Sequence, residues 1–128
     1  MKEIILNSSA SVTETVTENL TAKAVGSGSL LVFGTPMMIA LMEKTTCKAV
    51  EKFLENDETT VGTKINVSHI SPSVVGKNIT VSAKISEVNG KAINFEVTAC
   101  DDNGVIGKGE ISRFVVNSQK FMAKAENK

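Results

Sequence analysis

The chain has 128 residues, with 14 basic and 14 acidic side chains and a formal net charge of zero at pH 7. This length predicts one domain over residues 1–128, with a hydrophobic core large enough to need no disulfide or metal. The balanced charge, without a basic run between aromatic residues, argues against nucleic acid and acidic membranes as partners, and no apolar run is long enough to predict a membrane span.

The cysteine pattern indicates a reducing compartment. Cys47 and Cys100 are far apart and match no CxxC or metal-ligand spacing. Reduced thiols are typical of cytosolic proteins, and residues 1–7 contain too short an apolar run for a signal peptide. With one histidine in the chain we expect no metal site, and nothing in the sequence calls for another cofactor. We therefore expect a soluble, cytoplasmic protein.

The first predicted element is a strand. Residues 8–24 are rich in serine and threonine, and Val12 and Val16 are spaced poorly for a helix. This composition predicts a strand at an edge of the sheet. The segment Gly26-Ser27-Gly28-Ser29 then breaks regular structure.

A long helix is predicted to begin at Thr35-Pro36, because threonine is a favoured N-cap and proline a favoured first helical residue. It should run to about Leu54 and end at Asn56-Asp57, since charged side chains gather on one outer face over this range. These side chains are Lys44, Lys48, Glu51, Lys52 and Glu55.

From Thr59 onward the apolar residues alternate with polar ones, as in half-buried strands. Four strands are therefore predicted, over residues 61–69, 79–85, 93–99 and 106–116. Asn89-Gly90 and Asn103-Gly104 predict hairpin turns with positive φ at both central positions. One strand, a long helix and four antiparallel strands give an α+β domain in which a curled sheet wraps the helix, the hotdog architecture.

Glu43 is an acid within an apolar stretch of the predicted helix. Helical spacing places it on one stripe with Ile39, Thr46, Val50 and Phe53, so we expect it to face the core. A carboxylate that loses water without gaining a partner is suited to act as a general base. Two alternatives are a salt bridge with a nearby lysine and a helix rotation that takes Glu43 to solvent.

Thr35 has two compatible interpretations. As an N-cap its hydroxyl would accept a hydrogen bond from the Met37 or Met38 amide. A hydroxyl at a helix N-terminus, beside unpaired amides, is also well placed against a developing oxyanion.

His69 shares a strand face with Ile65 and Val67, which should point toward the helix. It is either a satisfied buried histidine or the group that transfers protons near pH 7. With Glu43 also facing inward, we expect an acid and an imidazole in one apolar site.

Two further residues stand out in the strands. Gly62 weakens a strand, which indicates either a close approach to the backbone or a bulge. Arg113 lies mid-strand, where an arginine is either a solvated edge residue or a ligand for a carboxylate or phosphate.

Several segments, taken in order and with their spacing, resemble the hotdog thioesterases related to fluoroacetyl-CoA thioesterase. They are Val25 to Gly28, Thr35-Pro36, Leu41 to Glu43, Val61 to Thr63, Val67 to His69 and Gly107 to Arg113. The resemblance covers nearly the whole chain. It implies a catalytic group of Thr35, Glu43 and His69, with Gly62 near the thioester carbonyl and Arg113 near an acyl carboxylate.

The resemblance implies hydrolysis of an acyl-CoA thioester, with Glu43 and His69 as base and acid acting on water or through the Thr35 hydroxyl. The fluoroacetate-specific enzyme carries an aromatic lid where this chain has Gly26 to Ser29. The resemblance therefore implies thioester hydrolysis but leaves open whether fluoroacetyl-CoA is a substrate. The rival interpretation is a non-catalytic hotdog module that binds acyl-CoA or another small apolar ligand. A hotdog hydratase ranks lower, because the resembling segments belong to thioesterases.

The spacing of the helical residues predicts an oligomer. Thr35 and Glu43 are separated by about 12 Å along an ideal helix, which is too far for a direct hydrogen bond. We therefore expect a homodimer, or a dimer of dimers, in which two subunits build one site.

Overall fold

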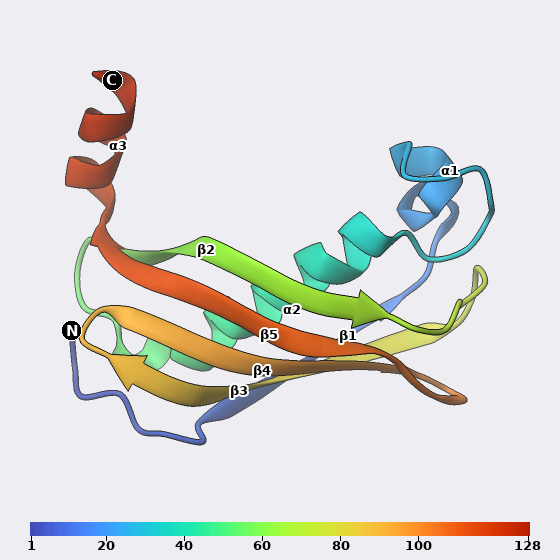
Figure 1. The fold of residues 1–128 in the computed structure, drawn as a ribbon, viewed down its shortest axis with the longest axis horizontal. Coiled ribbons are helices and arrows are strands. Elements are labelled where there is room, and N and C mark those ends of the chain that lie inside the picture. The colour runs from blue at the N-terminus through green and yellow to red at the C-terminus, as the bar shows by residue number, and fades with distance from the viewer.

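The computed structural model describes residues 1–128 and shows a curled five-stranded antiparallel sheet packed against one long helix (Figure 1). The strands are β1 (Ser9–Thr15), β2 (Glu58–His69), β3 (Asn78–Asn89), β4 (Ala92–Asp101) and β5 (Gly104–Asn117), in the order β1-β3-β4-β5-β2. The helices are η1 (Glu18–Leu20), α1 (Ala22–Val25), α2 (Thr35–Val50), η2 (Glu51–Phe53) and α3 (Ser118–Glu126). The expected α+β hotdog architecture is confirmed.

The first strand lies at a sheet edge as predicted, but it is shorter than expected. β1 pairs only with β3, and the chain turns into η1 and α1 within the range 8–24. Thr21 caps α1, because its side chain accepts a hydrogen bond from the Ala24 amide. Gly26, with φ of 77°, ends that helix in the left-handed region.

The helix α2 packs against the inner face of the sheet, but its buried stripe differs from the predicted one. Its buried residues are Met38, Leu41, Met42, Thr45, Thr46, Ala49 and Val50. The stripe therefore runs through Met38, Met42 and Ala49, while Glu43 lies at its margin, half-buried. Of the predicted stripe, Thr46, Val50 and Phe53 are buried as expected. Ile39 and Glu43 are only half-buried, so toward the start of the helix the predicted stripe is wrong by about one residue of helical rotation.

The four later strands lie where the alternation predicted them, and their inward side chains join α2 in one core. Both hairpin turns occur within one residue of the predicted places, but of the four predicted turn residues only Gly90 and Gly104 have positive φ. Each turn is shifted by one residue from its predicted centre, because Asn89 pairs with Ala92 and Asp101 pairs with Gly104, which leaves residues 90–91 and 102–103 in the turns. The expectation of two positive-φ residues per turn is therefore wrong.

The strand β2 forms the second edge of the sheet and pairs only with β5. The helix α2 lies mainly over β1, β3 and β4, which leaves the inner face of β2 less covered. Ile65 is 39% exposed although its partner Ile111 is fully buried. Hydrophobic surface therefore remains open along β2.

The C-terminal helix α3 projects from the end of β5 and has no buried residue (Figure 1). Asn117 caps it by accepting a hydrogen bond from the Lys120 amide. Neither α3 nor any other helix combines the length and hydrophobicity needed to cross a bilayer.

Candidate active site

Thr35 and His69 meet at the start of α2, where the end of β2 passes the helix N-terminus. The Thr35 Oγ1 and His69 Nδ1 atoms lie 2.8 Å apart, within hydrogen-bond distance. We call these two side chains the hydroxyl–imidazole pair. A hydroxyl bonded to an imidazole is the arrangement in which the ring can take the hydroxyl proton as the oxygen attacks an electrophile.

Thr35 is not the N-cap that the sequence predicted. Gly34 occupies that position, and its carbonyl accepts from the Met37 and Met38 amides at 3.0 Å each. Thr35 is instead the first helical residue, with Pro36 after it. Because the cap does not use the Thr35 hydroxyl, that hydroxyl is free to bond His69.

His69 is half-buried, and its ring meets the Phe33 ring edge-on with centroids 6.5 Å apart. The loss of water on burial lowers the pKa of His69 below its ordinary value, although a hydrogen bond with the Ser71 backbone opposes this shift. The Nε2 atom is buried and has no hydrogen-bond partner in the chain. The imidazole therefore favours its neutral form, which can accept a proton.

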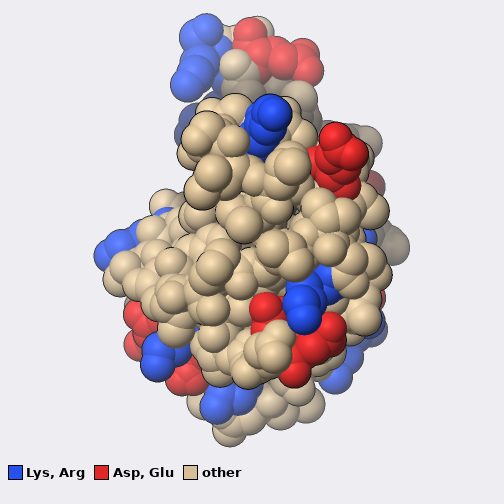
Figure 2. Space-filling view, turned by 90° about the vertical axis from the view of Figure 1, so that its right-hand side faces the viewer, with Lys and Arg blue, Asp and Glu red and all other residues tan.

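An open cavity of about 300 Å³ borders the hydroxyl–imidazole pair. It is lined by Ala22, Ser27, Val32, Phe33, Thr35, His69, Ile70, Ser71 and Pro72, none of which carries a fixed charge. The two segments that line most of this cavity, 27–35 and 69–72, also expose the apolar side chains of Leu30, Leu31 and Ile70. Figure 2 looks onto this end of the molecule, where uncharged side chains cover most of the surface and charged side chains lie above and below this uncharged area. The cavity thus suits an uncharged group.

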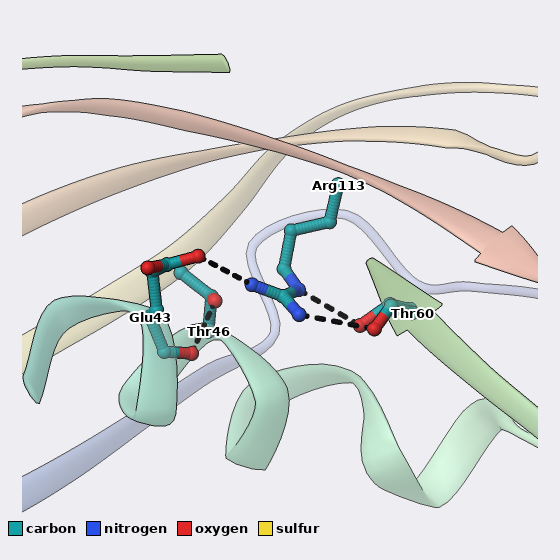
Figure 3. Close-up of polar contacts among 4 residues, drawn as sticks. All are labelled: Glu43, Thr46, Thr60 and Arg113. Carbon is teal, nitrogen blue, oxygen red and sulfur yellow. Dashed lines mark hydrogen bonds and ion pairs between the residues drawn. The ribbon is translucent and has the colours of Figure 1, made fainter. Parts of the chain in front are cut away.

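Glu43 lies in a second cluster, facing β2 and β5 (Figure 3). Its Oε2 atom is 3.2 Å from the Arg113 NH1 atom, and Arg113 also donates to the Thr60 hydroxyl and the Thr60 carbonyl. We call Glu43, Arg113 and Thr60 the carboxylate clamp. The Glu43 side chain is 37% exposed. Glu43 is therefore not the fully core-facing acid that was expected, and its partner is a distant arginine rather than the nearby lysine of the first alternative.

Arg113 is not a solvated edge residue, because it is only 7% exposed and points inward from β5. Gly62 pairs with it across the two strands. A Cβ atom on Gly62 would lie 2.7 Å from the Glu43 Oε2 atom. The close approach predicted at Gly62 is confirmed, and so is the bulge, because the register of β2 shifts between Gly62 and Lys64.

The two clusters are separate within one chain. Seven residues of β2 separate Gly62 from His69, which corresponds to about 23 Å along a strand. The structure therefore unites Thr35 with His69, and Glu43 with Gly62 and Arg113, but it does not bring the acid and the imidazole into one site as expected. No group of three or more acidic, histidine or cysteine side chains is arranged to hold a metal ion.

Thr60 is a site residue that the sequence reading missed. A signal was present, because Thr60 and Gly62 alternate on one strand face and Gly62 was already marked as a point of close approach. The alternation could not reveal that the Arg113 guanidinium lies beside Thr60 and Gly62.

Comparisons with known proteins point to one family of thioesterases. The model of the fluoroacetyl-CoA-specific thioesterase family matches residues 16–119. The fluoroacetyl-CoA thioesterase of Streptantibioticus cattleyicolor is 36% identical over 97 residues, which cover 76% of this chain and 70% of that enzyme.

Two solved structures share the fold. A structure of a fluoroacetyl-CoA thioesterase superposes with a TM-score of 0.93 at 28% identity, covering 99% of this chain and 98% of the other. A hot-dog-like protein from Thermanaerovibrio acidaminovorans superposes with a TM-score of 0.87 at 17% identity, covering 95% and 90% of the two chains. The second likeness concerns the fold alone.

Proposed function

This chain belongs to the fluoroacetyl-CoA-specific thioesterase family, and from that membership we propose that it hydrolyses the thioester of an acyl-CoA to a free acid and coenzyme A. The observation that carries the proposal is the 2.8 Å contact between the Thr35 Oγ1 and His69 Nδ1 atoms beside an uncharged cavity. Together they offer a nucleophile, a proton acceptor and room for an acyl group.

In the proposed reaction the thioester carbonyl lies at the N-terminus of α2, where the positive end of the helix dipole and the Gly62 amide of the partner subunit polarise it. Thr35 Oγ1 attacks the carbonyl carbon while its proton passes to His69, or a water molecule attacks in its place. The carbon–sulfur bond then breaks, and the thiolate takes up a proton and leaves as coenzyme A. When Thr35 is the nucleophile, a water molecule then hydrolyses the Thr35 ester, which releases the free acid and restores the Thr35 hydroxyl. Glu43 serves as the second proton-transfer group, and Arg113 borders the acyl group beside it. Mass spectrometry after rapid quenching distinguishes the routes, since only the first forms an acyl-enzyme.

A second copy of the chain completes the site in this proposal. β2 is a 12-residue edge strand, and a long unpaired edge is a template for pairing with another chain. Antiparallel pairing of two β2 strands about a two-fold axis sets the His69 end of one against the Gly62 end of the other. The hydroxyl–imidazole pair of one subunit then faces the carboxylate clamp of its partner. A stable, fully active monomer in sedimentation and turnover assays would refute this arrangement.

The test of the proposed function is release of free thiol from a panel of acyl-CoAs, including acetyl-, fluoroacetyl-, propionyl- and longer chains. Turnover on any of them separates the enzyme from a non-catalytic module, which would bind the same ligands without releasing thiol. We expect no dependence on the fluorine substituent, because Gly26 to Ser29 offer no aromatic side chain near the cavity. The free cysteines, Cys47 and Cys100, are consistent with the cytoplasmic location that we propose.

The pH dependence of kcat/KM should follow the titration of His69, because the proposed reaction needs its imidazole in the neutral form. Burial lowers the pKa of His69, so the neutral form persists as the pH falls below the ordinary histidine value of about 6.5. The acid limb of kcat/KM should therefore have its midpoint below about pH 6.5. Circular dichroism over the same pH range controls for unfolding, and a midpoint above that value contradicts the assignment of His69 as proton acceptor.

Replacing Gly62 by alanine should displace the Glu43 carboxylate. The new Cβ would lie 2.7 Å from the Glu43 Oε2 atom, while the backbone of Gly62 needs no positive φ. Because misplacement of a reacting group by 1 Å can lower a rate about 10²-fold, we expect a loss of that order in kcat with an intact fold. Gly28→Ala is the matched control, since its Cβ would make only ordinary contact with Ala22. Equal turnover in both variants would contradict the placement of Glu43 in the site.

A further inference from the structure

We infer that Thr60 is a positioning residue that fixes the Glu43 carboxylate by holding the guanidinium of Arg113. The inference rests on the proposed function only for the role of Glu43. The contacts themselves are a property of the fold, and Figure 3 shows how the three side chains lie between α2, β2 and β5.

Thr60 holds the guanidinium at two points. Arg113 Nε donates to the Thr60 hydroxyl at 2.8 Å, and Arg113 NH2 donates to the Thr60 carbonyl at 3.0 Å. Two hydrogen bonds from one edge of a planar group fix both its position and its plane. Thr60 and Arg113 are each only 7% exposed, so water does not readily replace either contact. Once this edge is fixed, the opposite edge of the guanidinium faces α2.

The opposite edge of the guanidinium meets Glu43. Arg113 NH1 lies 3.2 Å from the Glu43 Oε2 atom, whereas the Oε1 atom has no protein partner. The space for this carboxylate exists because Gly62, two residues after Thr60 on the same strand face, lacks a side chain. Thr60 and Gly62 thus determine together where the carboxylate lies. Oε2 is held, and Oε1 stays free to exchange a proton.

The contact of Thr46 shows that the helix does not supply this orientation. The Thr46 hydroxyl donates to the Glu43 backbone carbonyl at 2.6 Å, not to the carboxylate. The polar contact of the carboxylate group therefore leads through Arg113 to Thr60. Loss of the Thr60 hydroxyl leaves the guanidinium with one hydrogen bond to β2, about which it can pivot.

Thr60→Val removes the hydroxyl and keeps the shape of the side chain. We expect kcat to fall about 10- to 100-fold with KM little changed, because the carboxylate is misplaced rather than removed. Thr60→Ser keeps the hydroxyl and should recover most of the activity. Thr59→Val is the matched control, because this exposed neighbour lies on the other strand face. Wild-type kcat in Thr60→Val would overturn the inference.

A double-mutant cycle separates positioning from general damage. If Thr60 acts through the Glu43 carboxylate, Thr60→Val should lower kcat little further in a Glu43→Gln background. An equal loss in both backgrounds would show a structural role and overturn the inference.

The only arginine of the chain also gives a readout that needs no turnover. Its Nε–H signal in nuclear magnetic resonance should be protected from solvent exchange in the wild type and in Thr60→Ser, but not in Thr60→Val. A signal that stays protected in Thr60→Val overturns the inference whatever the activity. Absence of thiol release by the wild type would instead count against the proposed function.

Discussion

Glu43→Gln is expected to lower kcat on acyl-CoA by about 10²- to 10⁴-fold, the usual effect of removing a positioned proton-transfer group. Glutamine has nearly the same shape, and its carbonyl oxygen can still accept a hydrogen bond from Arg113 NH1, which contacts Glu43 Oε2 at 3.2 Å in the wild type. The substitution therefore removes the ability to take a proton while it retains most of the packing. Steady-state thiol release measures the effect.

The stability of Glu43→Gln must be measured with its turnover, because Arg113 loses its ionic partner. Removal of one partner from a fully buried pair costs about 3–5 kcal/mol of unfolding free energy. The Glu43 side chain is 37% exposed, so we expect a smaller loss that leaves the variant folded at assay temperature. Glu51→Gln, at an exposed acid just after α2, is the control and should be fully active. Turnover of Glu43→Gln close to wild type would remove Glu43 from the mechanism.

Local signals in the sequence predicted the elements of the fold. The Thr35-Pro36 pair marked the start of α2, and the period-two alternation after Thr59 located four strands within a few residues. The errors were local too. Gly34 took the N-cap position because its carbonyl is placed to accept the first helical amides, and the propensity of threonine for that position did not decide the outcome.

The carboxylate clamp could not be predicted, because it depends on contacts between residues far apart in sequence. Glu43 and Arg113 are separated by 70 residues, and they meet only because β2 crosses to the far edge and pairs with β5. The sequence showed an acid within an apolar segment and a glycine within a strand. It did not show that the Glu43 carboxylate fills the space left by the missing side chain of Gly62. A rotation of α2 by about one residue also decided whether Glu43 entered the core or faced β2.

His69→Ala should reduce kcat by about 10²- to 10⁴-fold, since it removes the group placed to accept the Thr35 proton. The cavity beside the ring is already open, so we expect the fold to survive the truncation. Circular dichroism and thermal unfolding check the fold, and thiol release measures kcat. A variant that is folded and as active as the wild type would show that Thr35 is not activated by this imidazole.

His69→Ala and Glu43→Gln together test where the two halves of the site meet. If His69 of one subunit works with Glu43 of the partner subunit, a heterodimer of the two single variants contains one site with both native side chains. Heterodimers isolated through two affinity tags should then regain about half of the wild-type turnover per dimer. The matched control joins a wild-type subunit to the double variant. It contains the same substitutions but leaves one defect in each site, so it should stay inactive. The reverse result would place Glu43 and His69 of one chain in the same site, against the distance between the two clusters in the structure.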